Sequence, residues 1–397
     1  MTAALSTPHF AKRIGPTLVP DHSRVLMRAF RPSTDDIARR IVARVMALPE
    51  DEAARQLDHV LGEFANRHER VDAFFRKRFE QVKIYLEPGA QLSDERQMLI
   101  GAYFTHEYSV ESAALFNPSI VPDPDQSGLP QGALRFILSL RATGEGHISS
   151  ITFRTGTISA QGCIVLTPAV PFVTEPKRVS DVAYGKELFA HKLEGAGVQN
   201  DFCRRVLDKL HEDFTLKELH AVLHASGLTD ISDAKASRAA RAILLLAESG
   251  YEVSFTPDSQ LSQRVLFPSA PSQSNGIEDA RFVRFQKDDG GFNYYATYTA
   301  YDGKVTQPQL LETPDFLHFK FNMLNGPAVQ NKGMALFPRK INGRYAMLSR
   351  QDDENILIMF SDNIHFWSEP KLLVFPAQPW EFVKIGNCGS PIETEAG

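Results

Sequence analysis

The pattern of apolar and polar positions changes several times along the chain and predicts alternating helical and β-rich zones. In "STDDIARRIVARVMALP", near the N-terminus, apolar residues recur with the 3.6-residue period of an amphipathic helix. Ser33 or Thr34 can cap this helix, Pro49 stops it, and Ser93 can cap a later helix of the same zone. Charged residues of both signs cover the polar faces, as on a solvated helix surface. This zone predicts a helical domain without chemistry of its own.

The second zone is rich in Ile, Leu, Val, Phe and Thr and predicts β-structure. The stretch "GALRFILSLRATGEGHISSITFRTGTISAQGCIVLTP" gives three short strands, at about 134–140, 148–154 and 162–166, with Gly-containing turns between them. Antiparallel strands joined by short turns are typical of a propeller blade or of part of a β-sandwich.

The pattern becomes helical again from about residue 175 to residue 250. Three stretches, "NDFCRRVLDKLHEDF", "TLKELHAVLHAS" and "SDAKASRAARAILLLAESG", have an amphipathic period, and their cap residues are Asn200, Thr215 and Ser232. Gly250 lies where a C-cap glycine is expected. This segment predicts an α-helical insertion.

From Tyr251 onward short aromatic-rich strands return, as in "YEVSF", "RFVRF" and "FLHFKFNML". The pair Asn342-Gly343 in "INGR" predicts a type I′ hairpin turn. Strand–turn units at near-regular spacing favour a propeller or a sandwich over an α/β fold. We therefore expect a mainly β protein in five segments, which are an N-terminal arm (1–33), a helical domain (34–110), a first propeller blade (111–174), a helical insertion (175–250) and the remaining blades (251–397).

Composition and charge narrow the function classes. The formal net charge of −5 argues against a dedicated nucleic-acid binder, because neutralising phosphates needs a basic surface. The N-terminus lacks the apolar run of a signal peptide, and no segment approaches the ~20 apolar residues of a membrane span, so we expect no membrane partner. The three cysteines have no metal-ligand spacing, and we expect reduced thiols in a cytoplasmic protein.

Two histidines have a spacing that occurs in metal sites. His220 and His224 are four residues apart on a predicted helix, which is a spacing that can bind zinc. The sequence offers neither a general base between them nor an evident third ligand. We therefore expect both histidines on a helix surface, and no metal.

One stretch, "SQSNGIEDARF" (272–282), concentrates charge where a strand is about to begin. If that strand begins at Phe282, the preceding turn holds Glu278, Asp279 and Arg281 at one end of a blade. Asp279 is then either a turn residue that pairs with Arg281 or the working acid of a site in a central cavity. The stretch alone favours the turn.

Other stretches add groups that can bind a sugar or an anion. "YATYTAYDG" places tyrosines, which can stack on a sugar face, ahead of Asp302. Arg141 lies at the end of a predicted strand, and Lys332 and Arg350 flank the strands of "NKGMALFPRKINGRYAMLSR". "GNCGSPIETEAG" ends the chain with a Gly-rich turn and the carboxylates of Glu393 and Glu395.

Taken together, these stretches resemble glycoside hydrolase family 130, the β-mannoside phosphorylases and mannosidases. The motifs that carry the resemblance are "GIEDAR", "YTAYDG", "ALFPRKINGRYAMLSR", "FSDNIHFWSEP" and "GSPIETEAG", and more weakly "FNPSI" and "LSLRATGEG". The resemblance covers roughly 112–170 and 251–397. It leaves both helical zones outside, as an N-terminal extension and an insertion.

The resemblance implies a five-bladed β-propeller with a sugar site in its central cavity, and a single inverting displacement. It implies that Asp279 is the general acid and acts through a hydroxyl of the bound mannose. Phosphate, the co-substrate of a phosphorylase and the only cofactor-like molecule expected, would be held by cations, here Arg141, Lys332 and Arg350. The residues that the resemblance places at a small oligosaccharide substrate are Asn275, Glu278, Arg281, Tyr298, Tyr301, Asp302 and Arg141.

The chain departs from the family pattern at two positions. Ala280 replaces the proline of the usual GIEDPR motif, which loosens the turn. Glu393 stands where phosphorylases tend to have a cation, and its carboxylate would repel phosphate but can serve as a base for water. The expected reaction is phosphorolysis that releases α-mannose 1-phosphate. Hydrolysis with Glu393 as the base and non-catalytic carbohydrate binding remain as alternatives.

The length of the β-rich segments sets one more expectation. At about 40–50 residues per blade they provide about four blades, whereas the family fold has five. We therefore expect a propeller that is truncated at its C-terminal side, with doubtful activity of this chain. An open blade exposes a sheet edge, which favours a homo-oligomer. A further hypothesis is an assembly protein whose helical zones form the oligomer or cover the cavity.

Overall fold

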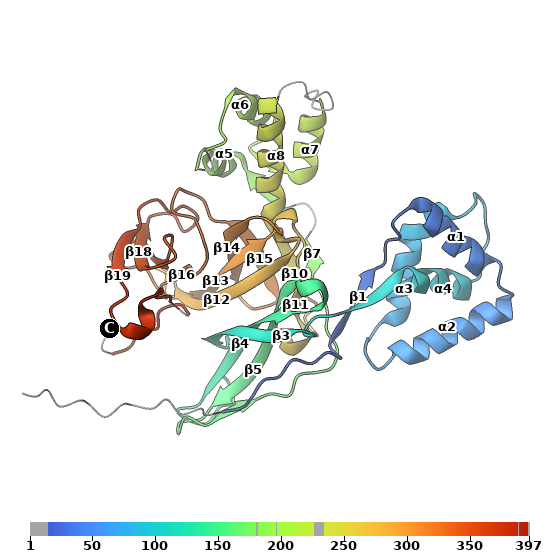
Figure 1. The fold of residues 1–397 in the computed structure, drawn as a ribbon, viewed down its shortest axis with the longest axis horizontal. Coiled ribbons are helices and arrows are strands. Elements are labelled where there is room, and N and C mark those ends of the chain that lie inside the picture. The colour runs from blue at the N-terminus through green and yellow to red at the C-terminus, as the bar shows by residue number, and fades with distance from the viewer. Residues whose placement is uncertain (1–14, 180–181, 196, 226–233, 388, 396–397) are drawn as a thin grey trace, which may run out of the picture.

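Helices and strands segregate along the chain much as the apolar pattern predicts. The computed structural model describes residues 15–179, 182–195, 197–225, 234–387 and 389–395 (Figure 1). Strands dominate the central part of the molecule, with one group of helices beside it and another above it (Figure 1). The protein is therefore mainly β, with two helical additions.

The N-terminal helices pack around an apolar core of their own, which includes Phe75 and Leu99. Thr34 caps the first of them by accepting from the Ile37 N–H, and Ser93 caps the last by accepting from the Arg96 N–H, as predicted. These helices are α1 (Asp35–Met46), α2 (Glu50–Phe64), α3 (Val71–Val82) and α4 (Asp94–Tyr103). A strand that the apolar pattern did not predict, β1 (Val25–Ala29), lies in the N-terminal arm and pairs with β2 (Thr105–Ser109).

A buried ion triad joins this N-terminal part to the β-rich part. Glu111, with a fully buried side chain, accepts from Arg24 Nε at 2.9 Å and from Arg154 Nη2 at 2.8 Å. Arg24 also donates to the carbonyls of Val170 and Ser262. The carboxylate of Glu111 thus has two cationic partners, and each arginine has Glu111 as its counter-charge. The triad is therefore paired despite its burial.

The strands form antiparallel meanders. One large sheet runs in the order β3-β4-β5-β12-β13-β14-β15-β10-β7, and a second runs β16-β17-β18-β19. The predicted strands at 134–140, 148–154 and 162–166 correspond to β4, β5 and β6. The strands and their bounds are β3 (Ala114–Pro122), β4 (Leu134–Thr143), β5 (Ser149–Ile158), β6 (Ile164–Leu166), β7 (Lys177–Arg178), β10 (Tyr251–Ser254), β11 (Val265–Leu266), β12 (Gly276–Gln286), β13 (Phe292–Tyr301), β14 (Thr306–Thr313), β15 (His318–Met323), β16 (Ala335–Leu336), β17 (Tyr345–Ser349), β18 (Ile356–Ser361) and β19 (Lys371–Val374).

An aromatic core holds the large sheet together. Phe153, fully buried in β5, meets Phe316 at 5.8 Å and Phe319 at 6.0 Å between ring centroids.

The Asn342-Gly343 turn before β17 has φ values of 51° and 78°, which are the positive angles that a type I′ turn requires. The prediction of a type I′ turn at Asn342-Gly343 is therefore confirmed.

The helical insertion stands on the large sheet (Figure 1). Its helices begin at residue 186 rather than 175, because β7 and β8 (Ala183–Gly185) precede them, and β8 pairs with β9 (Asp213–Thr215). Asn200 caps α6 by accepting from the Cys203 N–H, as predicted, whereas Ser232 and Cys388 lie outside the described residues. The helices are α5 (Lys186–Gly195), α6 (Asp201–Asp208), α7 (Leu216–Ala225) and α8 (Ala234–Ser249).

Within the described residues, no helix has the length and the apolar content that crossing a bilayer requires.

Candidate active site

Asp279 lies in a β-bulge inside strand β12 and not in a turn before the strand. The prediction that the strand begins at Phe282 is wrong, since β12 begins at Gly276 and pairs with β13 on both sides of the bulge. The register shifts between Glu278 and Arg281, and Asp279 has a φ of 55° in the left-handed region. Such bulges redirect side chains, and a non-glycine residue in this conformation stores strain that the surroundings must hold.

Arg141 of β4 holds the two carboxylates of this bulge. Its Nη2 donates to Glu278 Oε1 at 2.8 Å, and its Nη1 donates to Asp279 Oδ1 at 3.0 Å. Its Nε donates to the hydroxyl of the buried Ser149 at 2.9 Å, and its guanidinium lies over the ring of Phe116. All three kinds of guanidinium nitrogen are therefore engaged, which orients Arg141 and fixes both acids.

A second bulge, in β3, faces the first. Asn117 has a φ of 50° at a register shift between Phe116 and Ser119, and its Nδ2 donates to Asp279 Oδ1. The hydroxyl of Ser119 accepts from the Phe282 N–H at 2.8 Å, which joins β3 to β12 just after the Asp279 bulge. Asp279 is thus held from two strands and keeps 23% of its side-chain surface exposed.

The loops before β16 and after β17 bring two more cations to the same place. Lys332 Nζ donates to Glu278 Oε2 at 2.7 Å, so the buried Glu278 lies between Arg141 and Lys332. Arg350, which follows β17, donates from Nε to the carbonyl of Lys332 at 3.2 Å. Gly333 makes this approach possible, because a Cβ at this glycine would lie 2.6 Å from Arg350 Nε. We call Asn117, Arg141, Glu278, Asp279, Lys332 and Arg350 the Asp279 cluster.

Arg350 is the cation of the Asp279 cluster that makes no ion pair within the described residues; its charge helps to lower the pKa of Asp353, which itself pairs with Lys384. Within the described ranges its terminal nitrogens have no hydrogen-bond partner, and Nη1 lies beside Gly386, where a Cβ would be 3.1 Å away. Arg281 donates from Nη1 to the carbonyl of Gly333 at 3.1 Å and so supports the same loop. Arg141, Arg281, Lys332 and Arg350 carry four formal positive charges against two negative charges on Glu278 and Asp279, which favours binding of an oxyanion.

The structure brings three other predicted residues to the open end of the β12–β13 hairpin, opposite its turn and next to the Asp279 bulge. The Asn275 N–H donates to the Tyr301 carbonyl at 2.9 Å, and the Asn275 amide group packs against Gly303. Asp302 accepts from the Lys304 and Val305 N–H groups, so it shapes the turn. The bonds from Val305 and Lys304 lower the pKa of Asp302. Asn275 and Tyr301 flank the cluster. The carboxylate of Asp302 instead accepts hydrogen bonds from backbone N–H groups of its own turn.

Two predicted site residues lie elsewhere. Tyr298 is 2% exposed, and its hydroxyl bonds Gln273 and Gln309 in the core, so the proposed contact of this tyrosine with a sugar is contradicted. Its burial raises its pKa well above the usual value. Glu393 accepts from Arg339 Nε and Nη2 at 2.6–3.0 Å, which lowers the pKa of Glu393. Its hydrogen bonds therefore join it to Arg339 and not to the Asp279 cluster.

Residue patterns missed part of this site. Asn117 belongs to the cluster, and Ser149 and Phe116 contact it. Only "FNPSI" gave a signal for these residues, because an Asn-Pro pair inside a strand disturbs the ladder. His220 and His224 are exposed on α7, and His220 lies 3.9 Å from Glu248. In the described part of the chain, no group of three or more His, Cys, Asp or Glu side chains could hold a metal ion.

The C-terminal part of the chain is similar to one family of known proteins. Residues 242–397 match a family model described as beta-1,4-mannooligosaccharide phosphorylase. A 1,2-beta-oligomannan phosphorylase of Thermoanaerobacter sp. (strain X514) is 32% identical over 144 residues, which are 35% of this chain and 46% of that protein. A beta-1,4-mannooligosaccharide phosphorylase of Ruminococcus albus is 40% identical over 73 residues, 17% of this chain and 22% of that protein.

The structure of a beta-1,2-mannobiose phosphorylase from Listeria innocua in complex with beta-1,2-mannobiose matches with a TM-score of 0.33 and 18% identity, over 73% of this chain and 67% of that chain. The chain spans less than half of the length of each of the two curated relatives above. The family-model match over residues 242–397 and these relatives agree with the motifs and support a relationship to glycoside hydrolase family 130.

Proposed function

We propose that this protein cleaves β-mannosides by phosphorolysis, with inversion at the anomeric carbon and release of α-mannose 1-phosphate. The observation that carries the proposal is the Asp279 bulge, where an acid held by Arg141 and Asn117 belongs to the same cluster as Arg350, a cation that makes no ion pair within the described residues. The family and the printed activities of the relatives support phosphate as the acceptor.

The contacts suggest a division of labour within the cluster. Asp279 is the proposed general acid, and Arg141 and Asn117 are positioning residues that aim its carboxylate. Arg350 is the proposed phosphate ligand, because its terminal nitrogens are open. Lys332 is engaged by Glu278, so its share in phosphate binding requires an exchange of that ion pair.

The proposed reaction is one displacement. A phosphate oxygen attacks the anomeric carbon on the face opposite the leaving oxygen, the glycosidic bond breaks, and a new C–O bond to phosphate forms with inverted configuration. The leaving oxygen takes a proton that originates at Asp279 and passes through a sugar hydroxyl. The phosphate proton neutralises the charge that Asp279 then bears. Arg350 offsets the negative charge of the incoming phosphate.

We also propose that the antiparallel meanders are blades of a five-bladed propeller. The sheets β12-β13-β14-β15 and β16-β17-β18-β19 each contain successive antiparallel strands, as a blade does. The Asp279 cluster combines residues of β3, β4 and β12 with the loops beside β16 and β17, so it lies where separate meanders meet. Division of the chain into an arm (1–33), a helical domain (34–110), a first blade (111–174), an insertion (175–250) and further blades (251–397) fits this proposal.

The test is product analysis with β-1,2- and β-1,4-mannobiose, each with and without inorganic phosphate. The proposal predicts mannose 1-phosphate of α configuration by phosphorus and proton NMR, and only when phosphate is present. Free mannose formed at the same rate without phosphate would establish hydrolysis instead. Sugar binding without any product would establish a carbohydrate-binding protein.

A further inference from the structure

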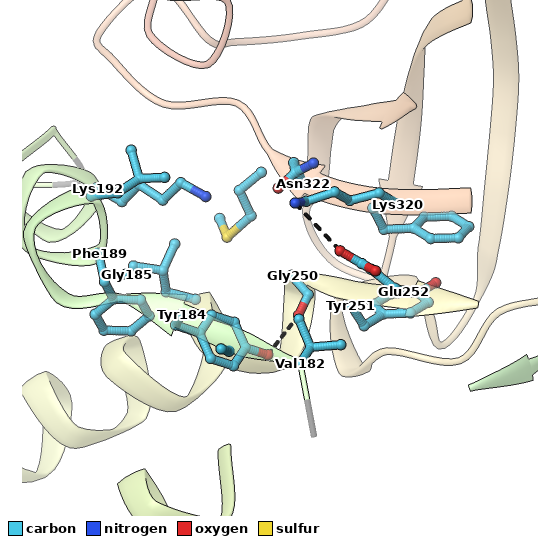
Figure 2. A pocket seen from close by; sticks show the side chains of 15 residues that line it. Val182, Tyr184, Gly185, Phe189, Lys192, Gly250, Tyr251, Glu252, Lys320 and Asn322 are labelled. Atoms are coloured by element: carbon cyan, nitrogen blue, oxygen red, sulfur yellow. Dashed lines mark hydrogen bonds and ion pairs between the residues drawn. The ribbon is translucent and has the colours of Figure 1, made fainter. Parts of the chain in front are cut away.

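A pocket lies between the helical insertion and the sheet. Figure 2 shows Lys192 of α5 on one side and Lys320 and Asn322 of β15 on the other, with Tyr184 and Gly250 below them. Lys320 and Asn322 point to this pocket because side chains alternate along β15, where Phe319 and Phe321 face the core. None of the hydrogen bonds or ion pairs of the described residues joins the pocket lining to the Asp279 cluster.

Two polar groups that face this pocket are donors without acceptors. Within the described residues, the Lys192 ammonium has no hydrogen bond or ion pair, and no dashed line reaches it in Figure 2. Asn322 is 5% exposed, and its Nδ2 is buried with no partner. Buried donors are almost always paired, so an orphan donor indicates a missing acceptor. The half-buried Lys192 and the buried Asn322 lie on opposite walls, and together they indicate a ligand that accepts from both.

The charges at the pocket point to an anion. Its charged lining residues are Lys192, Lys320 and Glu252, and Lys320 pairs with Glu252 at 3.3 Å, which leaves one formal positive charge. Burial and the neighbouring Lys320 lower the pKa of Lys192 to about 8. Burial, followed by repulsion from the two lysines, lowers the pKa of His365 to about 4. A ligand with one negative charge would neutralise the excess.

The size and the walls of the pocket define the rest of the ligand. The pocket volume is about 90 Å³. A water-sized position takes about 10–15 Å³ on this scale, so the pocket holds on the order of six to nine non-hydrogen atoms. Leu188, Phe189, Leu246 and Met323 provide apolar walls. The ligand therefore needs one anionic end and a short apolar body.

We propose that this pocket binds a short-chain carboxylate of about four to seven carbons. Its carboxylate lies between Lys192, Lys320 and the Asn322 amide, and its chain lies against Leu246 and Met323. A monoanion matches the single positive charge better than a phosphate dianion does. Because the ligand contacts both α5 and β15, it fastens the helical insertion to the sheet. This site is separate from the proposed catalytic cluster and does not depend on the proposed function.

Calorimetric titration of the protein with butyrate tests the proposal. The titration is done in an Arg350→Met background, because Arg350 is another cation that could attract a carboxylate. We expect saturable butyrate binding, no binding of the uncharged 1-butanol, and weaker binding of inorganic phosphate. Absence of saturable butyrate binding, or equal binding of 1-butanol, would overturn the proposal. Phosphate bound more tightly than butyrate would likewise overturn the assignment to a carboxylate.

Two variants locate the binding at this pocket. Lys192→Met keeps the aliphatic stem but removes the charge, and Asn322→Asp puts a fixed carboxylate where the ligand carboxylate would lie. Each should weaken butyrate binding at least about tenfold, as expected for a lost charge-assisted hydrogen bond. Lys77→Met, which changes an exposed lysine of α3, is the matched control and should bind like the parent. Binding by both pocket variants within about twofold of the parent would refute the location.

Discussion

Glu278 is the buried centre of the ion pairs behind the Asp279 bulge, and its neutralisation tests that arrangement. Its side chain is 8% exposed and lies 2.8 Å from Arg141 and 2.7 Å from Lys332. Charges about 4 Å apart attract by about 4 kcal/mol at an effective dielectric constant of about 20, and by about 1 kcal/mol in water. The Lys332 side chain is 33% exposed, so solvent screens this pair. We expect a coupling free energy of about 1–3 kcal/mol between Glu278 and Lys332.

A double-mutant cycle of Glu278→Gln and Lys332→Met, measured by urea unfolding, gives this coupling directly. Trp367 reports on the region, because it is fully buried in the same apolar cluster as Met334, close to the Lys332 loop. Glu278→Gln alone should lower the free energy of unfolding by about 1–3 kcal/mol, since Lys332 loses its carboxylate partner while Arg141 keeps Asp279.

The control for this cycle is Lys304→Met, which changes an exposed lysine. It should alter the free energy of unfolding by no more than about 0.5 kcal/mol. A coupling between Glu278 and Lys332 below about 0.5 kcal/mol would refute the view that these ion pairs hold the bulge.

Three further predictions follow from single positions. Gly276→Ala should lower the free energy of unfolding by about 1–3 kcal/mol in a thermal melt, because φ is 149° and a Cβ would lie 3.1 Å from Ser149; an unchanged melt would contradict this. Burial lowers the pKa of His365 to about 4, so its stabilising contribution is complete above about pH 6.5 and is lost as the pH falls towards 4. His365→Gln should therefore reduce the pH dependence of unfolding by on the order of 3 kcal/mol, and an identical pH profile would count against it. Arg350→Met should raise the KM for phosphate about 10–100-fold, whereas Arg339→Met, whose arginine binds Glu393, should leave it unchanged; equal effects would disprove the phosphate role of Arg350.

Local signals in the sequence predicted much of the fold. The caps Thr34, Ser93 and Asn200 and the turn at Asn342-Gly343 depend on residues within about four positions, and the structure has all of them. The burial of Tyr298 could also have been predicted from the sequence. Tyr298 lies two residues from both Ala296 and Ala300 along β13, so the three side chains share one face of the strand, and that face is in the core.

The geometry of the site depends on long-range pairing that no local pattern encodes. Arg141 is 138 residues from Asp279, and Asn117 is 162 residues away. The Asp279 bulge exists because β12 shifts its register against β13. The motif therefore identified the aspartate as a candidate, but it did not predict the conformation of this residue. In the same way, "PIETEAG" suggested a catalytic base, whereas the fold pairs Glu393 with Arg339.

The central claim is that the carboxyl group at position 279 supplies the proton for glycosidic cleavage, and the rate of mannose 1-phosphate formation by Asp279→Asn tests it most directly. Asparagine keeps the shape of the side chain and can still bond Arg141 or Asn117 in part, so circular dichroism should remain that of the parent. The account predicts a fall in this rate of about 10²–10⁴-fold at saturating phosphate. A rate within a few-fold of the parent would contradict the account.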